Sequence, residues 1–485
     1  RAPLAQALAD QAESRFEDDA LRTRILSVRA AIAVVRGRPA DALPMLLDAA
    51  ARTPDPVEAT DLLVRAGEAA AMAGDIGGLA QADERAQTLP AEVCREGRCW
   101  LTGVTRAASG RFEDALGPLR SASAAGEDTD DPRRLVWSAN ADTWLGDLDL
   151  TLARQSRAIE LARARGAFAT LAVALTRRGA LVAWMGRVND AWADGEEALQ
   201  LTEEAGLENS VGQARAVLAT VAALRGDAAT CRTQGELALA LAGRRGLVPV
   251  WETASFALAE LELGQGDHES ALTRLASFAA DPVLRTPLSC YGAVPPLAHA
   301  AGRCGRPELA VAAVDRLEAW GELTGVAWVR PMVLRCRGLL AEGDAAVRLF
   351  EESLALEGGA SSAGTRARTE LALGEALRRA GRRSDARVHL RAAMTTLDGL
   401  GATLWGERAR DELRATGESI RTRDPAAAST LTPQERRIAR FVSEGASNKE
   451  VASRLFLSPK TVEYHLGKVF QKLGVGSRAD LVALG

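Results

Sequence analysis

The sequence predicts an all-α protein in which a long stack of helical hairpins is followed by a small four-helix domain. The first reason is composition: 47% of the 485 residues are hydrophobic but only 4% are aromatic, and the abundant alanine, leucine, glutamate and arginine favour helix over strand. The second is a glycine that recurs every 36 to 40 residues. The third is a set of closely spaced helix-start signals near the C-terminal end.

Ten glycines mark the repeat, and each is followed by Arg or Asp. They are Gly37, Gly74, Gly110, Gly146, Gly186, Gly226, Gly266, Gly305, Gly343 and Gly381. The residue seven positions earlier is always small: Ala30, Gly67, Gly103, Ala139, Gly179, Ala219, Ala259, Ala298, Cys336 and Gly374. Six glycines have an alanine five residues later: Ala42, Ala115, Ala191, Ala271, Ala310 and Ala386.

Small residues at two fixed offsets are what a close crossing of two helices requires, because helix backbones approach only where side chains are minimal. The glycine can end the first helix by adopting the left-handed conformation. Each unit is therefore predicted to be a helical hairpin. One hairpin cannot bury its apolar face alone, so the ten units should stack into a superhelix. An irregular helical bundle is the alternative.

The pattern of a small residue, then Gly-Asp or Gly-Arg, then alanine resembles the tetratricopeptide (TPR) repeat. The unit here is longer than the family's, and we expect TPR-like repeats with longer turns between hairpins. Outside residues 430–485 the chain has 51 basic and 59 acidic residues, which a solvated surface explains. Arrays of this kind bind partners along a concave face, and we expect an unknown protein or small-molecule signal there.

The array is predicted to span residues 1–415, with a linker over 416–430 that carries Pro425 and lacks helical periodicity. A separate domain is predicted over 431–485, where four helix starts have recognisable caps. The caps are Thr432 with Pro433 and Glu435, Ser447 with Glu450, Ser458 with Pro459, and Ser477 with Asp480.

Apolar residues recur at helical spacing in this domain and predict one shared core. They are Ile438, Phe441, Val442, Val451, Ala452, Leu455, Val462, Leu466, Val469, Phe470 and Leu473. Only about three residues, Phe456 to Ser458, separate the second helix from the third, which is the spacing of a helix-turn-helix.

All four lysines of the chain, Lys449, Lys460, Lys468 and Lys472, lie in this domain. Residues 430–485 contain nine basic and five acidic residues within a protein of net charge −4. The helix expected from Pro459 to Leu473 leaves three of these lysines, Lys460, Lys468 and Lys472, on its outer faces together with Tyr464 and Gly467. A basic face on the second helix of a helix-turn-helix is typical of DNA recognition; a merely solvated charged face is the alternative.

The segment "LTPQERRIARFVSEGASNKEVASRLFLSPKTVEYHLGKVFQKLGVGSRADL" resembles the LuxR-type helix-turn-helix in its L-T-x-x-E opening, its S-N-K-E-V-A turn, its S-x-K-T-V-E-Y-H-L helix and its K-L-G-V-x-S-R ending. The resemblance implies double-stranded DNA as partner, with homodimers that pair through the last helix. DNA-contacting candidates on the recognition helix are Ser458, Lys460, Thr461, Glu463, Tyr464 and Lys468. Candidates for backbone clamps are Asn448, Lys449, Lys472 and Arg478. Gly467 replaces a longer residue that is frequent in the family.

A helical array before such a domain resembles the LAL (MalT-like) regulators, which carry an ATPase domain ahead of the array. That domain needs a P-loop lysine, and no lysine precedes Lys449. The chain begins inside what looks like a repeat, so we expect it to be the C-terminal part of a longer regulator or a shortened paralogue. Either way, no ATPase activity is expected from these residues.

Other function classes have little support. No run of 18 apolar residues predicts a membrane span, and no basic-then-apolar segment predicts a signal peptide, so a cytoplasmic protein is expected. The six cysteines and four histidines form no metal-ligand pattern. We therefore expect no enzyme activity, metal or cofactor, and a bacterial transcription regulator instead. The rival is a TPR-like interaction scaffold whose terminal domain docks protein rather than DNA.

Overall fold

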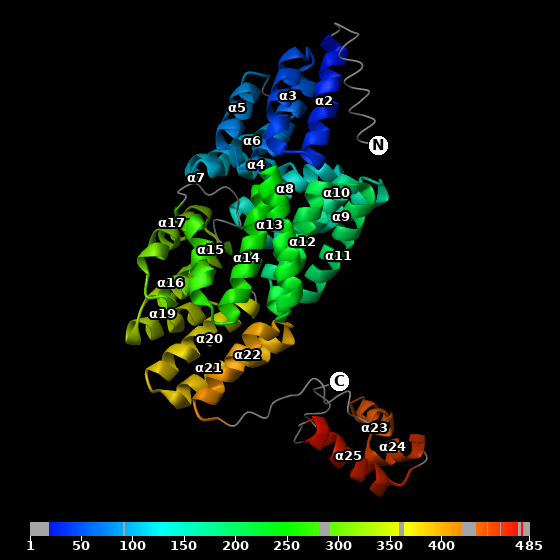
Figure 1. Cartoon of the computed structure of the whole chain (residues 1–485), viewed down its shortest axis with the longest axis vertical. Coiled ribbons are helices and arrows are strands. Elements are labelled where there is room, and N and C mark those ends of the chain that lie inside the picture. Colours follow the sequence, from blue (N-terminus) through cyan, green and yellow to red (C-terminus); the bar gives the residue numbers. More distant parts are fainter. Residues whose placement is uncertain are drawn as a thin grey trace. The chain divides into compact units, whose positions relative to one another are not determined.

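The computed structural model describes residues 19–90, 93–280, 292–357, 363–418, 433–443, 445–455, 457–473 and 477–478. The chain divides into two units, Arg1–Thr416 and Gly417–Gly485 (Figure 1). Within the described ranges there are 24 helices and no strand. This result confirms the all-α prediction. Most of the predicted linker lies outside the described residues.

The first unit consists of ten helical hairpins and one final helix. The first five hairpins are α2 (Asp19–Arg36) with α3 (Pro39–Arg52), α4 (Pro56–Ala73) with α5 (Ile76–Gln87), α6 (Arg95–Ala108) with α7 (Phe112–Ala124), α8 (Pro132–Leu145) with α9 (Leu148–Ala164), and α10 (Phe168–Trp184) with α11 (Val188–Ala205).

The next five are α12 (Glu208–Arg225) with α13 (Ala228–Arg245), α14 (Val248–Gly264) with α15 (His268–Ala280), α16 (Val294–Arg303) with α17 (Glu308–Thr324), α18 (Val329–Leu340) with α19 (Gly343–Leu356), and α20 (Ala363–Arg379) with α21 (Arg383–Gly399). Helix α22 (Thr403–Ala415) ends the array.

The small residues lie at the helix crossings, as predicted. A Cβ added to Gly374 on α20 would lie 2.5 Å from Leu390 Cγ on α21, and one added to Gly103 on α6 would lie 2.7 Å from Leu119 on α7. The alanines at the equivalent positions are fully buried, as are the alanines that follow the repeat glycines. Any larger side chain would push the paired helices apart.

Nine of the ten repeat glycines have a positive φ angle, which confirms their turn conformation, whereas Gly37 is not among them. Gly343 differs in position, because α18 ends at Leu340 and Gly343 is the first residue of α19. A second set of glycines with positive φ, which was not predicted, lies between hairpins: Gly166, Gly206, Gly246, Gly325 and Gly401.

The predicted longer turns between hairpins occur in only part of the array. Seven residues, 125–131, separate α7 from α8, as expected. Between Leu148 and Gly264, however, the prediction was wrong: turns are two or three residues long and the helices have 17 or 18 residues each. The extra residues of the unit therefore lengthen the helices there.

Segments about 175 residues apart contact each other. The indole Nε1 groups of Trp320 and Trp328 donate hydrogen bonds to the carbonyl oxygens of Trp144 (3.1 Å) and Gly146 (3.0 Å), across separations of 176 and 182 residues. Arg36 Nε donates to Gly206 O at 2.9 Å, across 170 residues. In the same way α22 lies against α12 and α14 (Figure 1). Successive turns of the superhelix thus touch, and side chains of one turn cap helix ends of another.

Replacing Gly146 by alanine tests this packing. Gly146 has φ +80, and its added Cβ would lie 2.7 Å from Val326 and 2.8 Å from Trp320. We expect Gly146→Ala to lower the free energy of unfolding by about 2 kcal/mol or more, measured by urea denaturation. Gly243→Ala is the control, because that helical position is open, and it should raise stability by up to about 1 kcal/mol. Equal effects of the two changes would refute the packing argument.

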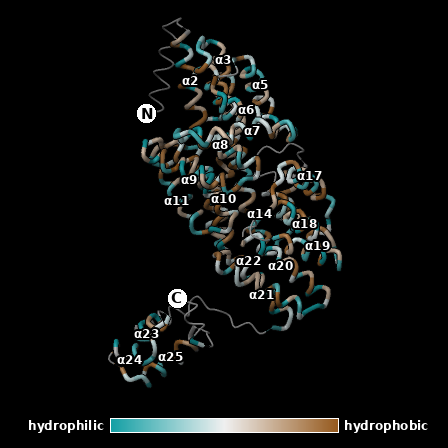
Figure 2. Tube along the Cα trace, turned by 180° about the vertical axis from the view of Figure 1, so that it is seen from behind, coloured by the Kyte–Doolittle hydropathy of each residue, from teal (hydrophilic) through white to brown (hydrophobic). Residues whose placement is uncertain are grey.

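Hydrophobic and hydrophilic residues alternate along the helices of the array (Figure 2). Among the helices that the structure describes, none is both long and apolar enough to cross a membrane. The pattern is that of helices with one buried face and one solvated face.

The second unit contains α23 (Pro433–Ser443), α24 (Asn448–Leu455) and α25 (Pro459–Leu473). Their core consists of Ile438, Val442, Ala446, Val451, Ala452, Val462, Leu466 and Val469, with Phe441, Leu455, Leu457 and Phe470 packed against it. Every predicted core residue is present except Leu473, whose side chain lies outside the described set. The three residues between α24 and α25 confirm the helix-turn-helix spacing. Of the predicted fourth helix, only Ser477 and Arg478 are among the described residues.

Candidate nucleic-acid interface

Helix α25 begins at the predicted cap. Ser458 Oγ accepts a hydrogen bond from the backbone N–H of Thr461 at 3.1 Å, and the two hydroxyl oxygens are 2.7 Å apart. Pro459 occupies the first helical position, where a missing N–H costs nothing. The cap fixes the start of α25 and places Lys460 in its first turn.

One face of α25 is buried and the other is open. Val462, Leu466 and Val469 pack in the core, whereas Lys460, Glu463, Tyr464, Gly467 and Lys468 are exposed. Helical spacing makes this division necessary, because core positions recur every three or four residues. A Cβ added to Gly467 would meet nothing within 4 Å, so this glycine leaves an open gap on the exposed face.

Tyr464 and Lys468 act as a pair on that face. The Tyr464 side chain is 60% exposed, which is unusual for a large ring with a free apolar surface. The ammonium nitrogen of Lys468 lies 4.6 Å from the centre of the ring, a cation–π distance. A hydrogen bond with Tyr464 raises the pKa of Lys468. The lysine is therefore charged at neutral pH and is held beside an exposed aromatic ring.

The start of α24 is held by a reciprocal capping box. The backbone N–H of Ser447 donates to Glu450 Oε2 at 2.7 Å, and the backbone N–H of Glu450 donates to Ser447 Oγ at 3.3 Å. The hydrogen bond from the Ser447 N–H lowers the pKa of Glu450. This cap confirms the sequence prediction.

Replacing Ser447 by alanine removes half of the capping box. We expect Ser447→Ala to destabilise the second unit by about 1 kcal/mol, measured by chemical denaturation followed through its far-ultraviolet circular dichroism. Ser443→Ala is the matched control, since among the described residues its hydroxyl donates only to the Arg440 carbonyl oxygen, and it should change stability by less than half that amount. An effect of Ser447→Ala no larger than the control would contradict the cap's energetic role.

Two of the predicted backbone clamps bind each other. Arg478 Nη1 donates to Asn448 Oδ1 at 2.8 Å, and Arg478 Nη2 donates to the carbonyl oxygen of Ala446. Arg478 thereby ties the C-terminal segment to the start of α24, a contact that the sequence could not indicate. Lys449 is exposed beside it, and the side chain of Lys472 is not among those described.

The charges of this surface are available for an anionic partner. Within the described part of the second unit, no ion pair neutralises Lys449 or Lys460. Lysines and free helix N-termini bind phosphates, and an exposed helix of this width fits the DNA major groove. The surface therefore has charges that suit a sugar–phosphate backbone, with Glu463 and Tyr464 exposed beside them.

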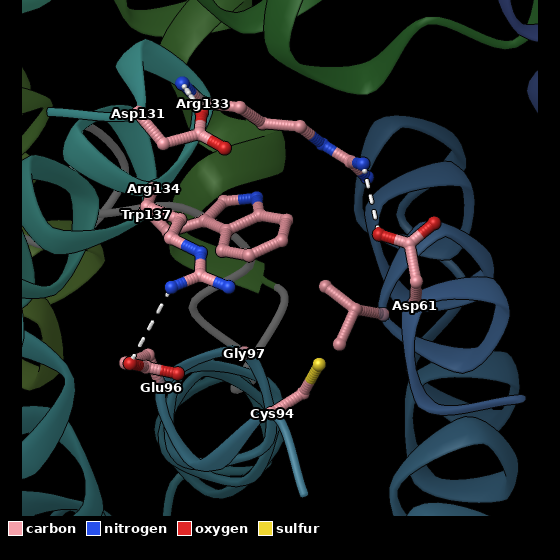
Figure 3. Close-up of a pocket in the computed structure, with 9 residues that line it drawn as sticks. Asp61, Cys94, Glu96, Gly97, Asp131, Arg133, Arg134 and Trp137 are labelled. Atoms are coloured by element: carbon pink, nitrogen blue, oxygen red, sulfur yellow. Dashed lines mark hydrogen bonds and ion pairs between the residues drawn. The ribbon is translucent and has the colours of Figure 1, made fainter. Parts of the chain in front are cut away.

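The array also contains cavities. One of about 120 Å³ lies between α4, α6 and α8 (Figure 3). Arg133 spans its edge, donating to Asp61 Oδ1 (3.0 Å) and Glu68 Oε2 (2.8 Å), while Trp137 Nε1 donates to Glu68 Oε1 (2.8 Å). Each of these polar groups has a hydrogen-bond partner within the protein. The cavity is therefore a feature of the packing between hairpins.

Two histidines lie close together near the C-terminal end of the array. The ring centres of His268 and His299 are 5.7 Å apart. Burial lowers the pKa of His268 to about 4 and holds the pKa of His299 well below its usual value, with Arg408 adding to both effects. Both rings are neutral at pH 7. Among the residues described, no group of three or more histidine, cysteine or carboxylate side chains is placed to bind a metal ion.

These pKa shifts predict a loss of stability in acid. A histidine whose pKa is depressed in the folded state contributes stability above its unfolded pKa of about 6.5, and that contribution is lost as the pH falls toward the folded pKa. We expect the unfolding free energy to decrease as the pH drops below 6.5. His299→Gln should reduce the slope of unfolding free energy against pH by up to about 1.4 kcal/mol per pH unit. Urea denaturation at pH 7.5 and 5.5 measures both. An unchanged slope in His299→Gln would show that His299 is not neutral in the fold.

Comparisons with known proteins identify the second unit. Residues 429–484 match the family model GerE, described as bacterial regulatory proteins of the luxR family. Proteins named as HTH-type transcriptional regulators in Mycobacterium tuberculosis and Mycobacterium bovis are 52% identical over 66 residues, which is 14% of this chain but only 8% of theirs. The transcriptional activator DevR/DosR of Mycobacterium tuberculosis is 38% identical over 83 residues, 17% of this chain and 37% of that protein.

The array has a structural neighbour. The crystal structure of a Rap protein complexed with Competence and Sporulation Factor has a TM-score of 0.50 and 11% sequence identity, and the match covers 71% of this chain and 99% of that one. At this identity the likeness concerns the fold alone. Its match, together with the ten hairpins, supports the TPR-like description of the first unit. The C-terminal unit is therefore a LuxR-type helix-turn-helix domain, joined in this chain to a TPR-like helical array.

Proposed function

We propose that this protein is a bacterial transcriptional regulator that binds specific double-stranded DNA through α25. The observation that carries the proposal is the exposed face of that helix, where Lys460, Tyr464 and Lys468 lie together opposite the buried core. The luxR-family match supports it. In this proposal the protein acts in the cytoplasm by binding, and not as an enzyme.

The proposed roles follow the geometry. Lys460, Thr461 and Lys468 contact DNA along α25, with Ser458 at its start, while Glu463 accepts from a cytosine amino group and Tyr464 packs on a thymine methyl group. Asn448, Lys449, Lys472 and Arg478 hold the backbone; Arg478 does so while bonded to Asn448. Two copies pair through the segment after Ser477 and read half-sites about 34 Å apart.

The TPR-like array is proposed to receive the signal that controls this pairing. Successive superhelical turns that contact one another form a structure whose pitch a ligand or partner could alter. The rival function is an interaction scaffold without specific DNA binding, and the exposed lysines of the second unit argue against it.

Binding to a duplex at several salt concentrations distinguishes the two functions. For a DNA-binding protein, the logarithm of the binding constant falls with the logarithm of the salt concentration, with a slope of about 0.9 per phosphate contacted. Lys449→Ala should reduce the size of that slope by about 1 for each bound domain. Arg348→Ala, which removes an exposed charge on α19 of the array, serves as the control and should leave the slope unchanged. A protein that binds no duplex even at low salt would favour the scaffold.

A further inference from the structure

A small cavity near the C-terminal end of the array is lined by four charged or polar side chains, those of His299, Arg335, Arg368 and Glu375, and by five apolar residues. It lies among α16, α18, α20 and α22, the first helices of three hairpins and the final helix. Its volume of about 30 Å³ is enough for one or two groups the size of a water molecule, such as the oxygens of a carboxylate. Buried polar side chains in such a place require partners.

Arg335 on α18 is a buried cation that forms no direct ion pair with a described carboxylate. Its side chain is 7% exposed, and Nη1 donates to the carbonyl oxygen of Thr365 at 3.0 Å. No carboxylate among the residues that the structure describes forms an ion pair with it. Glu357 is near enough to feel its charge, but Glu357 Oε1 instead accepts hydrogen bonds from Ser353 and Thr369. A buried unpaired guanidinium is costly unless an anion accompanies it.

The surroundings of the cavity carry an excess of positive charge. Arg368 on α20 binds Glu260 at 3.0 Å and lies 3.3 Å above the centre of the Trp405 ring. Glu375, the carboxylate in the cavity wall, is within 2.7 Å of Arg408, 3.6 Å of Arg303 and 3.7 Å of Arg379. Together with Arg335 and its neighbour Glu357 this makes five arginines against three carboxylates. Burial lowers the pKa of Arg368, and the nearby charges of Arg335 and Arg408 lower it further.

His299 on α16 adds an unused donor. Its side chain is 7% exposed, it lines the cavity, and its Nε2 has no hydrogen-bond partner among the described residues. The ring is neutral because burial, reinforced by the charges of Arg408 and Arg368, holds its pKa well below the usual value. A neutral imidazole can still donate one N–H.

We propose that this cavity binds the carboxylate or phosphate group of a small anionic ligand between Arg335 and the Nε2 of His299. The planar fork of a guanidinium matches two oxygens of either group, and one bound anion offsets part of the excess charge. The Glu375 carboxylate, already bound to arginines, restricts the anion to the opposite side of the cavity. Trp405 belongs to α22, the last helix before the second unit. If the array controls DNA binding, as proposed above, binding of a small anionic ligand at this site regulates DNA binding.

Titration calorimetry of the full chain tests the proposal with sodium phosphate and sodium acetate as probes, at constant ionic strength set by sodium chloride. We expect saturable binding of at least one probe. Preference for phosphate or for acetate identifies the group that the site takes. Arg335→Gln should weaken the binding at least tenfold, whereas Arg348→Gln, the same change at an exposed arginine, should leave it unchanged.

Stability without the probes provides a second readout. Because Arg335→Gln removes an uncompensated buried charge, its unfolding midpoint in probe-free buffer should equal or exceed that of the wild type. His299→Gln provides a further variant and should weaken binding severalfold. Absence of saturable binding to either probe, or wild-type binding by Arg335→Gln, overturns the proposal. DNA binding is measured on the same Arg335→Gln protein. A loss of anion binding can then be distinguished from a failure of the proposed DNA-binding function.

Discussion

Arg154→Met is expected to destabilise the array by about 3 to 5 kcal/mol, the cost of leaving a buried charge without its partner. Arg154 on α9 donates to both oxygens of Asp142 on α8, at 2.7 and 2.6 Å, and its Nη1 also lies 3.1 Å from Ser123 Oγ. The Arg154 and Asp142 side chains are 6% and 0% exposed. Burial raises the pKa of Asp142 even with Arg154 in place, so its carboxylate depends on this partner.

Two further variants make the test specific. Asp142→Leu combined with Arg154→Met removes both charges and should recover most of the lost stability. Arg157→Met, on the same helix, breaks only an exposed ion pair with Asp130 and should cost less than about 1 kcal/mol. Urea denaturation measures all three. A loss of less than 1 kcal/mol in Arg154→Met would show that the pair is not energetically important.

Lys460→Ala and Tyr464→Ala are expected to weaken operator binding by different routes. A base or phosphate contact is worth about 1 to 3 kcal/mol, so each variant should bind its operator roughly ten- to a hundredfold more weakly. The salt slope should fall by about 1 per domain for Lys460→Ala but should not change for Tyr464→Ala, because only the lysine releases counterions. Fluorescence anisotropy at several salt concentrations measures both quantities. Identical slopes in the two variants would contradict the assigned roles.

The sequence predicted the hairpin crossings and the terminal core because both depend on local spacing. Gly103 and Gly374 had to be small since a neighbouring helix lies against them, and a small residue at a fixed offset is visible in the chain. The caps at Ser447 and Ser458 were predictable for the same reason: each involves residues only three positions apart.

Contacts between distant parts of the chain could not be predicted. Trp320 and Trp328 cap carbonyl groups about 180 residues away, and nothing in the local pattern specifies the superhelical pitch that brings them there. Likewise Arg478 was predicted to hold DNA, and only the structure places its guanidinium on Asn448. The absence of a direct ion pair at Arg335 depends on several hairpins together, so no single repeat indicates it.

Selection of genomic DNA fragments by the purified chain, beside the Lys460→Ala, Tyr464→Ala double variant, tests the central claim most directly. The recognition role of α25 predicts that the wild type enriches fragments sharing an inverted repeat and that the double variant enriches none. Arg348→Ala is the control and should enrich the same fragments as the wild type. Enrichment of the same sequence by the double variant would contradict recognition through α25, and absence of enrichment by the wild type would contradict specific DNA binding by this chain.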